Sequence, residues 1–235
     1  MTTLTGPRRA PASGGAPKKL VVLLHGYGVD GDDLMALADP LAAALPDAEF
    51  VAPHAPDPAQ TVPGGRQWFV INEPHAVAQG ARDASALLDA YLDAELARAG
   101  LTGADMALVG FSQGAMMALY TGLRRADGPA AIVGFSGLLP DPQSLEAEIA
   151  CKPPVFLAHG EADPVVPPEG TAMAAQLLAD LGLGVAVHMT PGLPHTIAPE
   201  ALQIARAMLR DAFAGELALP PGAHRVAASR REPAN

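Results

Sequence analysis

The sequence predicts an α/β fold in which helices cover both faces of a mostly parallel central sheet. Short, continuous apolar runs such as residues 20–24 are typical of parallel strands that are buried on both faces. Segments with helical periodicity separate these runs over nearly the whole chain, which favours a layered β–α–β arrangement. The chain has 235 residues, 49% of them hydrophobic, which is enough to fill one core of this kind.

The predicted elements alternate in order along the chain. Strands are expected at residues 20–24, 48–52, 106–109, 130–135, 155–159 and 185–189. Helices are expected at residues 34–45, 78–98, 112–125, 171–181 and 199–213. Residues 1–17 and 216–235 are rich in Pro and Ala and lack periodicity, so they are predicted to be flexible tails. A single domain over 18–215 follows from this division.

Composition excludes several classes of partner. The net charge of −10 opposes binding to nucleic acid or to anionic membranes. Cys151 is the only cysteine, so the chain has no intrachain disulfide and no CxxC site. No apolar run approaches the ~20 residues of a membrane-spanning helix, and the N-terminus has no apolar segment typical of a signal peptide. We therefore expect a cytoplasmic protein that neither binds nucleic acid nor inserts stably into membranes.

The pentapeptide Gly110-Phe111-Ser112-Gln113-Gly114 is the strongest motif in the chain. It follows a predicted strand and begins a predicted helix, which is the context of a nucleophile elbow. The two glycines allow the strand and the helix to approach closely, and Ser112 is left at the tip of the turn. A chance match remains the alternative, because the chain has 24 glycines.

A serine nucleophile needs a base and a carboxylate that orients the base. After a nucleophile elbow the expected chain order is Ser, then Asp or Glu, then His. His195 fits as the base because it lies in a loop between the last predicted strand and the last helix, and Asp163 fits as the acid because it lies just past the strand at 155–159. The candidates with weaker contexts are Glu161, Asp141, Asp180, His159, His188 and His224. A solvated loop residue is the alternative for Asp163 and for His195.

Two backbone N–H groups are predicted to stabilise the oxyanion. One is that of Gln113, directly after the serine, and the other is that of Tyr27, in the glycine-rich loop that follows the first strand. The histidines show no ligand spacing such as H-x-x-x-H, so no metal site is expected.

Residues 53–77 form a long stretch with many prolines and glycines and little periodicity. It contains Trp68 and Phe69, which suggests either a flap over a site or a small apolar cluster under a surface loop.

Four segments resemble the phospholipase/carboxylesterase family of α/β-hydrolases, which includes bacterial carboxylesterases and acyl-protein thioesterases. They are Leu24-His25-Gly26-Tyr27-Gly28, the motif around Ser112, residues 159–167 and the loop around His195. The resemblance covers roughly residues 18–215 and implies the α/β-hydrolase fold without a large lid domain, an apolar acyl site and no cofactor. It agrees with Ser112, Asp163 and His195 as the triad. Tyr27, where the family often has Leu, and the insert after Pro53 depart from the family pattern.

We expect a serine carboxylesterase that acts on short- to medium-chain carboxylic esters. A substrate groove is predicted from apolar residues in loops at the same sheet edge, namely Trp68, Phe69, Leu138, Leu139, Val165, Val166 and Leu193, although each also has a packing explanation. An acyl-protein thioesterase or lysophospholipase that takes long acyl chains is the first alternative. A non-catalytic binding module is the alternative from another class, and the presence of all three triad residues disfavours it. Pairing of two copies into a homodimer is compatible with the sequence, although no feature demands it.

Overall fold

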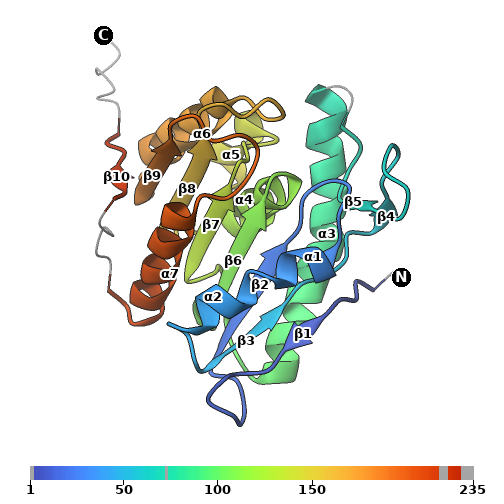
Figure 1. The fold of residues 1–235 in the computed structure, drawn as a ribbon, viewed down its shortest axis with the longest axis vertical. Coiled ribbons are helices and arrows are strands. Elements are labelled where there is room, and N and C mark those ends of the chain that lie inside the picture. Colours follow the sequence, from blue (N-terminus) through green and yellow to red (C-terminus); the bar gives the residue numbers. More distant parts are fainter. Residues whose placement is uncertain (1–2, 72–73, 217–221, 229–235) are drawn as a thin grey trace.

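An eight-stranded sheet forms the centre of the molecule in the computed structural model, which describes residues 3–71, 74–216 and 222–228. The strand order is β1-β3-β2-β6-β7-β8-β9-β10 (Figure 1). The strands are β1 (Arg8–Arg9), β2 (Lys19–Leu24), β3 (Ala48–Val51), β6 (Met106–Phe111), β7 (Ala131–Phe135), β8 (Val155–Gly160), β9 (Val185–Thr190) and β10 (His224–Arg225). The six inner strands are parallel, and β1 and β10 pair antiparallel at the two edges.

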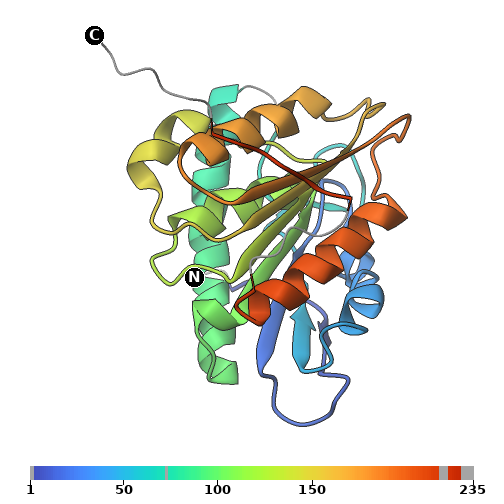
Figure 2. The same cartoon turned by 90° about the vertical axis from the view of Figure 1, so that its left-hand side faces the viewer.

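Helices cover both faces of this sheet, as the sequence predicts. Helices α1 (Gly31–Met35), α2 (Ala38–Ala42) and α7 (Pro199–Phe213) pack on one face. Helices α3 (Pro74–Ala99), α4 (Gln113–Arg124), α5 (Pro142–Glu148) and α6 (Pro168–Asp180) pack on the other (Figure 2). A 3₁₀ turn, η1 (Gly103–Asp105), precedes β6. The strand β2 shows why two layers are needed, because its alternate side chains enter two separate apolar cores.

The register of the parallel strands brings the ends of β2, β6, β7 and β8 to one edge. Leu24 pairs with Gly110, which pairs with Gly134, and the neighbouring Phe135 pairs with Ala158. Loops that follow these strands therefore lie side by side, where α/β sheets bind their ligands.

The long stretch 53–77 contains a small hairpin rather than an unstructured loop. Its strands β4 (Asp57–Pro58) and β5 (Arg66–Gln67) pair antiparallel, apart from the central sheet. Trp68 and Phe69, directly after β5, are buried in the core beside α3.

Several predicted boundaries differ from the structure. The expected helix at 34–45 is two short helices, α1 and α2, and α1 begins earlier because Asp30 caps it. Helix α5 was not predicted, because its seven residues are too few to show a helical period.

The predicted N-terminal tail contains a strand, β1, and its residue Leu4 is buried. The strand β1 could not be recognised from composition, because only two residues of this segment pair with the sheet. The predicted C-terminal tail likewise contains β10, which pairs with β9, while residues 217–221 and 229–235 lie outside the described part. Among the described helices, none has the length and hydrophobicity to cross a membrane.

Candidate active site

Ser112 lies in a strained turn between β6 and α4. Its φ of 54° and ψ of −119° fall outside the regions that non-glycine residues prefer, and it is the N-cap of α4. A backbone hydrogen bond of 2.8 Å from the Ser112 N–H to the Phe135 carbonyl fixes the turn to β7. A Cβ on Gly114 would lie 1.8 Å from the Leu24 carbonyl oxygen, and one on Gly110 would lie 2.2 Å from the Gly114 carbonyl oxygen. The crossing of strand and helix therefore requires glycine at both positions.

Asp163 and His195 meet at the same sheet edge. The His195 Nδ1–H donates to Asp163 Oδ2 over 2.6 Å, which leaves Nε2 free to accept a proton. The loops that carry them are joined, because the Ala162 N–H donates to the Leu193 carbonyl. The His195 ring also packs on Phe111, the neighbour of Ser112, with 4.8 Å between ring centroids. Among the described residues no hydrogen bond joins Ser112 to His195, as is common before substrate binds.

The carboxylate of Asp163 is held in its ionised form. Its side chain is buried, which by itself would raise its pKa. Hydrogen bonds from His195 and from the backbone N–H groups of Val166 and Val165 outweigh that effect and bring the pKa of Asp163 below its ordinary value. The side chain can therefore orient His195 and stabilise a positive charge on it.

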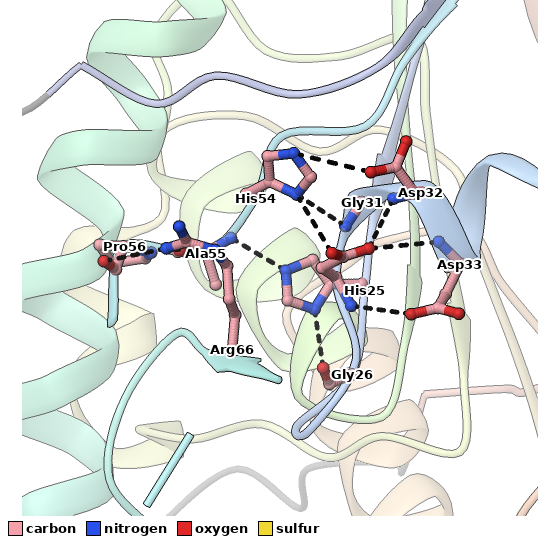
Figure 3. A network of polar contacts seen from close by, with 10 residues as sticks. His25, Gly26, Gly31, Asp32, Asp33, His54, Ala55, Pro56 and Arg66 are labelled. Atoms are coloured by element: carbon pink, nitrogen blue, oxygen red, sulfur yellow. Dashed lines mark hydrogen bonds and ion pairs between the residues drawn. The ribbon is translucent and has the colours of Figure 1, made fainter. Parts of the chain in front are cut away.

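The glycine-rich loop after β2 lies against the serine. A Cβ on Gly26 would stand 3.2 Å from the Ser112 Cβ, so only glycine fits without displacement. The carbonyl of Gly26 accepts a 2.7 Å hydrogen bond from His25 Nδ1 (Figure 3). In a trans peptide the carbonyl and the next N–H point in opposite directions, so the Tyr27 N–H points away from His25. This orientation fits the predicted oxyanion role of the Tyr27 N–H.

His25 was not singled out from the sequence, although it directly precedes Gly26. Its Nε2 accepts the Ala55 N–H at 2.9 Å, so Nδ1 carries the proton that goes to Gly26. Complete burial lowers the pKa of His25, so the ring is neutral and its tautomer is fixed. Arg66 anchors the same segment by donating to the carbonyls of Ala55 and Pro56.

Gln113 links the start of α4 to the segment after β5. Its Oε1 accepts the Trp68 N–H at 2.8 Å, and its Nε2 donates to the Phe69 carbonyl at 2.7 Å. The Trp68 indole N–H donates in turn to the His25 carbonyl at 2.9 Å. These bonds occupy the Gln113 side chain, so its backbone N–H, in the first turn of α4, is the group that can serve an oxyanion.

The predicted groove residues do not form one surface. Trp68, Phe69, Leu139 and Val166 are buried in the core between the sheet and helices α3–α6, and Leu138 packs partly buried against it, whereas Leu193 packs against the core on the α7 face. Val165 is 64% exposed, next to the acid loop. Trp68 and Phe69 line a cavity of about 370 Å³ against α3, and its lining contains none of Ser112, Asp163 and His195. The alternative of a small apolar cluster describes Trp68 and Phe69 better than a flap.

One cluster has the composition of a metal site. Asp30, Asp32 and His54 lie together near the start of α1. The Asp30 carboxylate already accepts the N–H groups of Asp32 and Asp33 as a helix cap, and His54 Nδ1 accepts the Gly31 N–H. Asp30 and His54 therefore accept backbone N–H groups at the start of α1, which explains their positions by the cap of this helix.

Comparisons with known proteins identify the family of the chain. A model of the phospholipase/carboxylesterase family matches residues 10–212. The crystal structure of esterase PE8 is 49% identical, with a TM-score of 0.86 over 89% of this chain and 99% of that chain. A probable carboxylesterase of Oryza sativa subsp. japonica is 32% identical over 85% of this chain and 91% of its own length. Acyl-protein thioesterase 1 of Gibberella zeae is 28% identical over 81% and 88%. The chain belongs to the phospholipase/carboxylesterase family of α/β-hydrolases, which are serine hydrolases.

Proposed function

We propose that this chain is a carboxylesterase that hydrolyses short- to medium-chain carboxylic esters through an acyl-enzyme on Ser112. The observation that carries the proposal is the 2.6 Å bond between Asp163 and His195 at the edge where Ser112 ends β6 in a strained turn. Esterase PE8 and the Oryza sativa carboxylesterase support the ester as substrate class. The cytoplasmic location and the pairing of two copies stay predictions.

The proposed reaction follows from the protonation of His195, whose Nδ1–H bonds Asp163 and whose Nε2 can accept a proton. Ser112 Oγ bonds to the ester carbonyl carbon as its proton passes to His195 Nε2. The carbonyl oxygen becomes an oxyanion between the N–H groups of Tyr27 and Gln113. His195 then gives its proton to the departing alcohol oxygen as the carbon–oxygen bond breaks. Water attacks the acyl-enzyme in the same way, its proton passes to His195 and then to Ser112 Oγ, and the carboxylic acid leaves.

The test is hydrolysis of p-nitrophenyl esters from acetate to palmitate by the wild type and by Ser112→Ala. We expect kcat/KM to peak at acetate or butyrate, and to fall by about 10⁴-fold or more in the variant. Thr5→Ala, at an exposed position of the N-terminal segment, is the matched control for a lost hydroxyl. Equal rates in wild type and Ser112→Ala would refute the mechanism. A peak at palmitate would transfer the assignment to a long-chain thioesterase or lysophospholipase, the activity named for the Gibberella zeae relative.

A further inference from the structure

A second histidine, His159, contacts the carboxylate of Asp163. Its Nε2 lies 3.0 Å from Asp163 Oδ2, the same oxygen that accepts the bond from His195. The side chains of His159 and Asp163 are both fully buried. His159 is the last residue but one of β8 and stands four residues before Asp163. It has no role in the reaction described above.

The partners of His159 determine where its protons are. Nε2 faces the Val166 carbonyl at 2.9 Å as well as Asp163 Oδ2, and both oxygens can only accept, so Nε2 carries a hydrogen. Nδ1 lies 2.7 Å from Thr171 Oγ1, and that hydroxyl lies 2.7 Å from the Gly137 carbonyl. The hydroxyl has one hydrogen, which it donates to the carbonyl, so Nδ1 needs a hydrogen of its own to bond Thr171. A neutral ring with its hydrogen on Nε2 would leave two lone pairs facing each other at 2.7 Å on the Thr171 side. A neutral ring with its hydrogen on Nδ1 would leave the Nε2 lone pair facing the Val166 carbonyl at 2.9 Å.

We propose that His159 is a buried imidazolium, protonated on both ring nitrogens, which shares the Asp163 carboxylate with His195 and acts as a positioning residue. The inference rests on the proposed function of the Ser112, His195 and Asp163 group. Asp163 supplies the counter-charge that a buried cation requires. Thr171, which is 1% exposed on α6, carries the contact on to Gly137. Gly137 lies beside the nucleophile turn, since a Cβ on it would stand 3.3 Å from the Ser112 carbonyl oxygen. The hydrogen bonds of His159 therefore end next to the turn that holds the nucleophile.

The charge on His159 affects the base. His195 becomes positive during catalysis while bonded to the same oxygen of Asp163, and a cation already paired with that carboxylate makes this second positive charge less favourable. Replacing His159 by a neutral side chain should therefore favour the protonated, inactive form of His195 relative to the unmodified protein. Among the described residues, Asp163 is the ionisable group in contact with the His159 ring. The loop after β7 and α6 contribute the neutral Gly137 and Thr171, and the loop after β9 contributes His195.

Two measurements test this inference. The first is ¹⁵N NMR of the imidazole nitrogens in the unmodified protein at pH 7, with the His159 signals assigned from His159→Gln. Two N–H protons on the ring are expected, and a single one would overturn the proposal. This measurement does not depend on the variant being active.

The second is the pH profile of kcat/KM for p-nitrophenyl acetate. In His159→Gln, which keeps an amide donor for Val166 and loses the charge, we expect the acidic limb to move up by about one pH unit. His188→Gln is the matched control, because His188 on β9 bonds only the Gly222 carbonyl among its described partners, and its limb should stay in place. If the acidic limb of the kcat/KM profile stays in place in His159→Gln, the proposal that His159 is charged is wrong. Activity that survives Ser112→Ala would instead refute the proposed function, so the two failures are distinct.

Discussion

His25 has both ring nitrogens bonded to backbone groups. It accepts the Ala55 N–H on one side and donates to the Gly26 carbonyl on the other. Since burial keeps the ring neutral, this arrangement does not change near neutral pH. A donor for the oxyanion is effective when its direction is set before the reaction, and His25 sets the direction of the peptide that contains the Tyr27 N–H.

We expect His25→Leu to lower kcat for p-nitrophenyl acetate by about 100-fold with little change in KM, because the Tyr27 N–H is no longer held in place. His25→Asn, which keeps a donor near the position of Nδ1, should retain more of the activity. Steady-state kinetics measure both variants, and circular dichroism checks that each is folded. A folded His25→Leu protein with wild-type kcat would show that the loop holds its shape without this side chain.

The short edge strand β1 is held by charged groups. Arg8 bonds Glu49 on β3 and Glu95 on α3, and both carboxylates also bond Arg98. Glu49 and Glu95 are 5% and 7% exposed, so each needs a cation in place of water. Burial acts to raise the pKa of Glu95, but the hydrogen bonds from Arg8 and Arg98 outweigh it and hold that pKa below its ordinary value. This network fastens the N-terminal arm across the sheet edge.

Replacing Arg8 with Met should lower the free energy of unfolding by about 2 kcal/mol at pH 7, because the buried Glu49 and Glu95 each lose one of their two cations and keep only Arg98. A carboxylate whose folded pKa is depressed contributes stability above its unfolded pKa and loses it as pH falls. The difference from wild type should therefore shrink as the pH falls below the ordinary Glu value near 4.5. Urea denaturation of both proteins at pH 7 and at lower pH measures this difference in the free energy of unfolding.

Lys18→Met is the control for Arg8→Met, since the Lys18–Asp47 pair is exposed and its loss should change the free energy of unfolding far less. A loss in Arg8→Met that is the same at every pH would show that the arginine acts through packing rather than through the carboxylates.

The turn at Ser112 could be predicted from the sequence, whereas the edge strand β1 could not. The strand at 106–109 and the pentapeptide around Ser112 belong to one local segment, so the sequence contains all the information on that turn. The close approach of Gly110 and Gly114 was predicted and is confirmed by the space available at each. The strand β1 could not be predicted, because two arginines have no strand pattern and the ion-pair partners of Arg8 lie 41 and 87 residues away.

The same distinction holds for the candidate site. Asp163 and His195 could be proposed because each follows a strand and the chain order is restricted. The roles of His25 and His159 depend on Ala55, Thr171 and Gly137, which come from other loops and from α6, so they became visible only in three dimensions. The apolar residues predicted to line a substrate groove do not form one surface, because an apolar residue near a site can pack into the core as readily as it can contact a substrate.

At the scale of the whole molecule, one sheet brings together groups that are far apart in the chain. Ser112 follows β6, Asp163 follows β8 and His195 follows β9, and the parallel register aligns the ends of these strands. The sheet is buried on both faces, so the loops rest on a rigid support. We propose that these three residues act as one group with Ser112 as the nucleophile.

The most direct test is mass spectrometry of the chain after reaction with a p-nitrophenyl alkylphosphonate. Ser112 Oγ should form a bond to phosphorus as p-nitrophenol leaves, and the adduct should map to Ser112 alone. His195→Gln should react at least about 10³-fold more slowly, because no base takes the serine proton. An adduct on another residue, or equal rates in the two proteins, would contradict the assignment.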